Sequence, residues 1–173
     1  MQPSCTVAGV SGRHVALAVA VLVAALARPA SADDPPFTIG SQPMWLALGG
    51  VTTGASFAPD DIGALVGGEL SVARLRDASF AGVYGDAYYD WGVHGTYATA
   101  GIELGHKYVG LDGGVALRFA GDATDLGATA RITVGIGVVG VYARYAHFFD
   151  TMTADDVVQV GLMLKLPLWT GGM

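Results

Sequence analysis

The sequence is poor in charged side chains, and this scarcity argues against an ordinary cytosolic globular protein. Only 14% of its 173 residues are Asp, Glu, Lys or Arg, whereas about a quarter are charged in an average soluble domain. Since 52% of the residues are apolar, an intrinsically disordered chain is also excluded. Nine basic residues stand against 15 acidic ones, giving a formal net charge of -6 that argues against nucleic-acid binding.

Cysteine and long apolar runs are equally scarce. Cys5 is the only cysteine in the sequence, so disulfides cannot stabilise the fold. The run from Val15 to Ala27 follows Arg13 and is shorter than the roughly 20 apolar residues that a transmembrane helix needs. It ends before the small residues Ala30 to Ala32, as an export signal does. We therefore expect a cleaved signal peptide at residues 1–32, with an uncleaved anchor as the alternative.

Residues 33–43 contain three of the seven prolines and are predicted to form an extended lead-in. After them, apolar residues recur at every second position, which is the period of a β-strand with two different faces. This alternation predicts eight strands, at 44–57, 62–74, 79–89, 93–105, 107–119, 125–136, 138–149 and 157–168. Short connections favour antiparallel pairing of consecutive strands. The predicted fold is all-β, an eight-stranded antiparallel up-and-down barrel over residues 44–169, with a C-terminal tail at 170–173.

Away from their ends, the predicted strands carry few charges, and all of these lie on the polar, glycine-rich face. Four are acidic and four basic: Glu69, Asp86, Glu103, Asp112, Arg118, Arg131, Arg144 and Lys165. Eight charges are too few to solvate the outside of such a barrel, but a balanced set suits a closed interior, where an unpaired charge is costly. The strands are also long enough to cross a bilayer, which takes about 9 to 11 tilted residues. We therefore expect a transmembrane barrel whose interior is filled by a charge-balanced polar network.

The remaining acids and the aromatic residues are expected at the barrel ends. Eight acids are assigned to alternate connections: Asp60, Asp61, Asp90, Asp122, Asp125, Asp150, Asp155 and Asp156. Near them lie Phe57, Tyr88, Tyr89, Trp91, Phe119, Phe148 and Phe149, while Trp45, Phe80, Tyr108 and Trp169 fall toward the other end. Two aromatic girdles are typical of outer-membrane barrels. The tyrosines Tyr84, Tyr97 and Tyr142 share the charged face, where their hydroxyls could join the polar network.

The predicted final strand carries a more specific pattern. Gln159, Gly161, Leu164 and Leu166 follow the order polar, glycine, apolar, apolar at fixed spacing. With the eight alternating strands, this pattern resembles the small eight-stranded outer-membrane barrels of the OmpA/OmpX type. In that family a similar pattern is an assembly signal read by the barrel-assembly machinery, although members usually end on an aromatic residue, and here four residues follow Trp169.

The resemblance implies a location in the outer membrane of a Gram-negative-type envelope, with outer-membrane lipid as a partner. It places the N-terminus in the periplasm and the acidic connections outside. Exterior carboxylates could bind divalent cations and, through them, lipopolysaccharide, since hard cations favour carboxylate oxygens. Acidic loops that serve only solubility are the favoured alternative.

No catalytic, metal-binding or cofactor-binding constellation stands out, so a structural or surface-interaction role is expected rather than an enzyme. An interior of eight strands is only wide enough for side chains, which argues against an open pore. Two other functions stay open. One is a secreted or periplasmic soluble barrel that binds a small apolar ligand, as lipocalin-like proteins do. The other is a lipid-modifying enzyme built on Ser71 or Ser79 with His106, in which replacing His106 would abolish a lipid-A modification.

Overall fold

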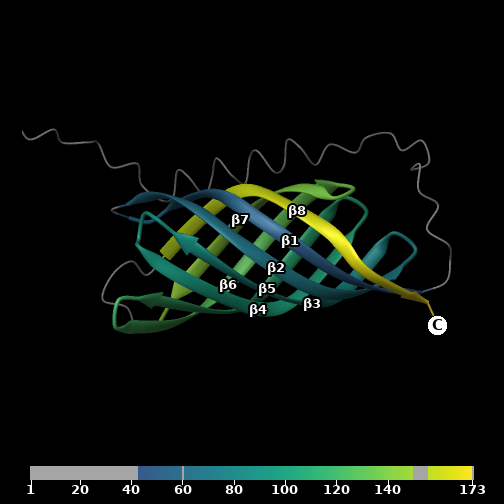
Figure 1. Cartoon of the computed structure of the whole chain (residues 1–173), viewed down its shortest axis with the longest axis horizontal. Helices are drawn as coiled ribbons and strands as arrows, with labels where there is room; N and C mark the ends of the chain where they lie inside the picture. Colours follow the sequence, from purple (N-terminus) through teal and green to yellow (C-terminus); the bar gives the residue numbers. More distant parts are fainter. Residues whose placement is uncertain (1–42, 60, 150–155, 173) are drawn as a thin grey trace, which may run out of the picture. The chain divides into compact units, whose positions relative to one another are not determined.

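A computed structural model describes residues 43–59, 61–149 and 156–172, and their strands form one closed antiparallel barrel (Figure 1). The strands are β1 (Met44–Phe57), β2 (Ile62–Arg76), β3 (Ser79–Asp90), β4 (Gly95–His106), β5 (Val109–Ala120), β6 (Ala123–Ile136), β7 (Val139–Phe148) and β8 (Asp156–Gly172). Each strand pairs with the next along the chain, and β1 pairs with β8 to close the sheet. The predicted signal peptide and residues 33–42 of the predicted lead-in lie outside the described residues.

The prediction of eight antiparallel strands in an up-and-down barrel is confirmed, with differences at the strand ends. Strand β5 begins at Val109 instead of residue 107, because Lys107 and Tyr108 form a two-residue turn and Lys107 has a φ of 52°. Strand β8 continues to Gly172, so residues 170–172, which the sequence assigns to a tail, pair with β1. A shift of register between Ala47 and Leu48 precedes this added pairing and places Trp169 opposite Ala47.

The connections divide the barrel into two ends. The terminal end holds the start of β1, the end of β8 and the two-residue turns 77–78, 107–108 and 137–138. The loop end holds the connections β1–β2, β3–β4, β5–β6 and β7–β8. In Figure 1 the terminal end lies on the side of the C-terminal label.

The polarity of the two faces of the barrel wall is the reverse of that in a soluble barrel. Apolar side chains on the outer face are widely exposed, as at Leu111 (58%) and Leu164 (41%). Charged side chains on the inner face are enclosed, as at Arg118 (0%) and Arg131 (2%). The barrel therefore surrounds a polar interior and presents an apolar outer surface.

Glycines on the inner face let neighbouring strands come close together. A Cβ atom added at Gly101 would lie 2.1 Å from the backbone oxygen of Gly113, and one at Gly114 would lie 2.1 Å from that of Ala100. Gly54 and Gly161 lie opposite each other on β1 and β8, and a Cβ atom at either would likewise overlap the backbone of the other strand. These inward glycines allow the tight curvature that a narrow barrel requires.

Candidate functional site in the barrel interior

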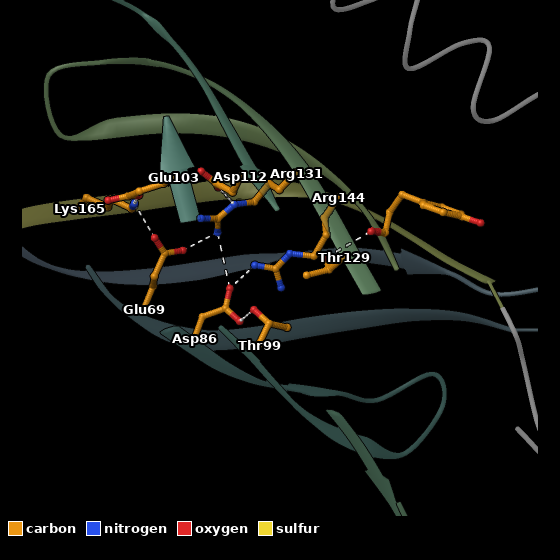
Figure 2. Close-up of polar contacts among 10 residues, drawn as sticks. Glu69, Asp86, Thr99, Glu103, Asp112, Thr129, Arg131, Arg144 and Lys165 are labelled. Atoms are coloured by element: carbon orange, nitrogen blue, oxygen red, sulfur yellow. Dashed lines mark hydrogen bonds and ion pairs between the residues drawn. The ribbon is translucent and has the colours of Figure 1, made fainter. Parts of the chain in front are cut away.

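A cluster of ionic side chains fills the middle of the barrel, with Arg131 of β6 at its centre (Figure 2). The Arg131 guanidinium donates hydrogen bonds to Glu69 of β2 and to Asp112 of β5. It also lies 3.6 Å from an Asp86 carboxylate oxygen on β3. One cation thus joins three strands that come from distant parts of the sequence.

Two further cations extend these contacts. Arg144 of β7 donates to Asp86, which also accepts a bond of 2.5 Å from the Thr99 hydroxyl. Lys165 of β8 forms ion pairs with Glu69 and, at 3.0 Å, with Glu103 of β4. We name these charged residues the central cluster: Glu69, Asp86, Glu103, Asp112, Arg131, Arg144 and Lys165. Each of the strands β2 to β8 contributes one member, so the ion pairs of the cluster connect opposite walls of the barrel.

Arg118, the remaining residue of the predicted network, belongs to a separate group near the loop end. Its guanidinium donates to Asp125 at 2.9 and 2.6 Å and lies 4.4 Å from the centre of the Phe148 ring. The ring of Tyr97 packs between Phe148 and Tyr88, stacking on the latter at a centroid separation of 4.8 Å. These residues form the loop-end cluster, in which the three aromatic rings are buried in the interior near that end.

The interior charges are not balanced, in contrast to the expectation from the sequence. Asp90 and Asp125, which the sequence assigns to exposed connections, are 0% and 7% exposed and lie in β3 and β6. With the four carboxylates of the central cluster they make six buried acids among the described residues, against the cations Arg118, Arg131, Arg144 and Lys165. Asp90 was missed because it is the last residue of β3, beyond the predicted end of that strand. Asp125 begins the predicted strand 125–136 but was counted with the connection before it, whereas β6 starts two residues earlier, at Ala123.

Aromatic rings accompany the buried cations. The guanidinium of Arg131 lies 5.1 Å from the Tyr84 ring centre, and that of Arg144 lies 4.9 Å from the Tyr88 ring centre and 5.9 Å from the Tyr142 ring centre. Such cation–π contacts help to compensate a guanidinium for its lost hydration. Of the tyrosines expected on the charged face, Tyr84 and Tyr142 therefore contribute their rings to the network, whereas Tyr97 stacks within the loop-end cluster.

Several aromatic residues assigned to the girdles instead face inward. Tyr88 (3% exposed) and Phe148 (1%) belong to the loop-end cluster, and Phe80 covers the inner side of Gly105. The exposed aromatic side chains at the loop end are Tyr89, Trp91, Phe119, Tyr145 and Phe149, and those at the terminal end are Trp45, Tyr108 and Trp169. Neighbouring strand residues point to opposite faces, so a run such as Tyr88–Tyr89 contributes only one ring to the outside.

The predicted assembly signal follows the two faces of β8. Gln159 is fully buried and Gly161 lies opposite Gly54, whereas Leu164 and Leu166 are exposed on the apolar face. The position of each residue in the wall therefore accounts for its type, with the polar residue and the glycine on the inner face and the two leucines on the outer face. Recognition of the pattern by an assembly machinery stays a prediction.

The residues considered for catalysis are only partly brought together. The Ser79 hydroxyl lies 2.9 Å from Nδ1 of His106 on the exposed surface at the terminal end, while Ser71 is buried on the inner face. Within the described chain, no carboxylate is hydrogen-bonded to His106, and no group of three or more His, Cys, Asp or Glu side chains could hold a metal ion.

The part of the chain that the structure describes contains no helix long and apolar enough to cross a membrane.

The fold and the interior together define a small closed β-barrel with a charged core. No protein-family model matches the chain, and no curated protein sequence or solved structure matches it either.

Proposed function

We propose that this protein is an outer-membrane β-barrel of the OmpA/OmpX type with a structural or surface-interaction role. The observation that carries the proposal is the distribution of charge across the barrel wall. Among the described strand residues on the outer face, Asp, Glu, Lys and Arg occur only near the two edges, at Arg74, Arg76 and Asp156. The surface between these edges consists of apolar and small residues with a few threonines, and an uncharged belt of this kind suits hydrocarbon rather than water.

The dimensions of the belt support the same conclusion. On β5 the outward residues run from Val109 to Phe119 without a charge. At about 3.3 Å per residue and a strand tilt of about 40°, this stretch spans roughly 25 Å along the barrel axis, the height of the apolar band in outer-membrane barrels. The exposed aromatic residues lie at its two borders, where interfacial girdles belong.

The interior favours a membrane barrel over a soluble ligand carrier. A barrel that binds an apolar ligand needs an apolar lumen, whereas here the central cluster occupies the lumen with ionic side chains. The same filling argues against a diffusion channel, because salt-bridged side chains from opposite walls cross the interior. With a ligand carrier and a channel both disfavoured, we expect a structural role in the membrane or contacts at its surface. The expected partners are lipid and the barrel-assembly machinery.

Cell fractionation tests this proposal directly. The chain, expressed with its N-terminal segment in a Gram-negative host, should stay with the outer membrane after washing with urea. It should also migrate faster on a gel before heating than after, because a folded barrel resists detergent at room temperature. Recovery in the soluble periplasmic fraction, with a mobility that heating does not alter, would contradict the proposal.

One contact favours a second candidate function, the modification of membrane lipids. Ser79 and His106 form a serine–histidine pair at a border of the apolar belt, where the ester groups of lipids would lie. A histidine within hydrogen-bond reach can accept the proton of a serine nucleophile. If the pair is catalytic, Ser79→Ala and His106→Ala should each abolish the release of fatty acid from vesicle lipids. Unchanged release by both variants, or none by the unmodified protein, would exclude this function.

A further inference from the structure

The outer surface at the terminal end combines basic and hydroxyl-bearing side chains on neighbouring strands. Arg76 of β2 lies opposite Ser79 of β3, and Ser79 lies opposite His106 of β4. We name these residues, with Arg74 and Lys107, the basic band: Arg74, Arg76, Ser79, His106 and Lys107. All five are exposed.

Hydrogen bonds fix the arrangement of the band. The backbone N–H of Lys107 donates to the carbonyl oxygen of Ala78 at 2.6 Å, which holds the β4–β5 turn against the β2–β3 turn. The Ser79 hydroxyl and His106 Nδ1 are 2.9 Å apart, so these side chains are also oriented together. Side chains opposite each other on paired strands are about 5 Å apart, so Arg76, Ser79 and His106 form a continuous row. Arg74 precedes Arg76 on the same face of β2, and Lys107 follows His106 in the chain.

The two ends of the barrel differ in the sign of their exposed charge. The basic band carries two arginines and a lysine, and the acid Asp77 stands beside Arg76 at 3.9 Å. At the loop end, the exposed charged residues within the described chain are Asp61, Asp122 and Asp156. The basic charge is therefore a property of the terminal end and not of the barrel surface as a whole.

The band also adjoins the apolar belt. Trp45 of β1 lies directly opposite Arg74, and the exposed rings of Tyr108 and Trp169 lie at the same end. Aromatic rings beside basic side chains suit the level where the acyl chains of a bilayer meet the phosphate groups.

We propose that the basic band binds the phosphate groups of anionic phospholipids in the leaflet at the terminal end. This inference rests on the proposed membrane location and names the lipid class that this end selects. Guanidinium groups donate paired hydrogen bonds to phosphate oxygens, while the lysine ammonium supplies further donors. A basic residue near a membrane surface favours anionic lipid by about 1 kcal/mol, or about fivefold in binding.

Quenching of tryptophan fluorescence by brominated lipids can measure this selectivity separately at each end. One form of the protein keeps Trp45 at the basic band through Trp91→Phe and Trp169→Phe. The other keeps Trp91 at the loop end through Trp45→Phe and Trp169→Phe. Each is folded into phosphatidylcholine vesicles that contain either brominated phosphatidylglycerol or the same fraction of brominated phosphatidylcholine.

The proposal predicts that phosphatidylglycerol is preferred at Trp45 by roughly fivefold or more and is not preferred at Trp91. Replacing the three cations together, as Arg74→Gln, Arg76→Gln and Lys107→Gln, should remove the preference at Trp45. The matched control, Asp61→Asn with Asp122→Asn, changes charge only at the loop end and should leave the preference at Trp45 intact.

Three results would overturn the inference. One is an equal preference for phosphatidylglycerol at both tryptophans, and another is a preference at Trp45 that survives loss of the three cations. The third is its abolition by inorganic phosphate at constant ionic strength, which would make the band a site for free phosphate. If brominated lipid quenches neither tryptophan, the barrel is not in the bilayer and the proposed function itself fails.

Discussion

Among single residues, Arg131 has the largest structural role in the interior. Its guanidinium is enclosed and contacts carboxylates from three strands. A buried cation of this kind is held by its partners, and those partners are in turn neutralised by it. The same reasoning applies to Arg118 and Asp125 near the loop end, which form a second buried pair.

Replacing Arg131 with leucine should destabilise the barrel by about 3 to 5 kcal/mol, because Glu69 and Asp112 would keep buried charges without their main cation. The free energy of unfolding in urea, measured by the loss of the heat-modifiable form, checks this. Arg76→Leu removes an exposed arginine and should change the unfolding free energy by less than about 1 kcal/mol. Equal effects of the two substitutions would contradict a structural role for the central cluster.

Sequence alone indicated which strand charges share the polar face, but not which charges pair. Arg131 and Glu69 are 62 positions apart, and their contact depends on how the closed sheet brings β2 and β6 across the lumen. Asp90 was missed for a different reason, since it lies beyond the predicted end of its strand. Pairing across a barrel is thus a property of closure, which the alternation of residues does not encode.

Within the strands, glycine acts differently on the two faces. On the inner face of β4, a Cβ at Gly101 would meet the backbone of β5 at 2.1 Å, so the close approach of the two strands depends on glycine. On the outer face of β3, a Cβ at Gly85 would have its nearest neighbour at 3.7 Å, an ordinary contact.

This contrast predicts different outcomes for the same substitution. Gly101→Ala should lower the free energy of unfolding by about 1 to 3 kcal/mol, because the strands must separate to admit the methyl group. Gly85→Ala should leave it unchanged or raise it slightly, since alanine restricts the unfolded chain more than glycine does. Urea titrations of both variants in the same detergent provide the measurement. The prediction fails if Gly101→Ala is as stable as Gly85→Ala.

Strand positions were predictable because inward polar and outward apolar residues alternate along nearly every strand. Strand ends were less so: the alternation continues through Lys107 and Tyr108, and only the left-handed backbone of Lys107 reveals the turn. The extension of β8 to Gly172 depends on the shift of register opposite Ala47, which leaves no simple pattern in the sequence.

At the scale of the whole molecule, an inverted distribution of polarity connects the fold to its proposed location. Away from its two edges, the wall encloses its strand charges and exposes its aliphatic side chains, so a barrel in water would present a broad apolar surface. Exposed apolar surface of that extent marks an interaction with lipid or with a partner. The sequence predicted this inversion from the scarcity and the balance of the strand charges, although the balance itself is not retained in the structure.

Placing an arginine in the middle of the outer belt tests the central claim most directly. Val115 of β5 is 57% exposed at the middle of the belt, whereas Ile136 is 79% exposed beside a turn at its edge. In bilayers, Val115→Arg should lower the free energy of unfolding by about 2 to 4 kcal/mol and Ile136→Arg by about 1 kcal/mol or less, because the penalty for a buried charge depends on depth. Equal and negligible effects at the two positions would mean that water covers both, and would contradict a barrel that spans a membrane.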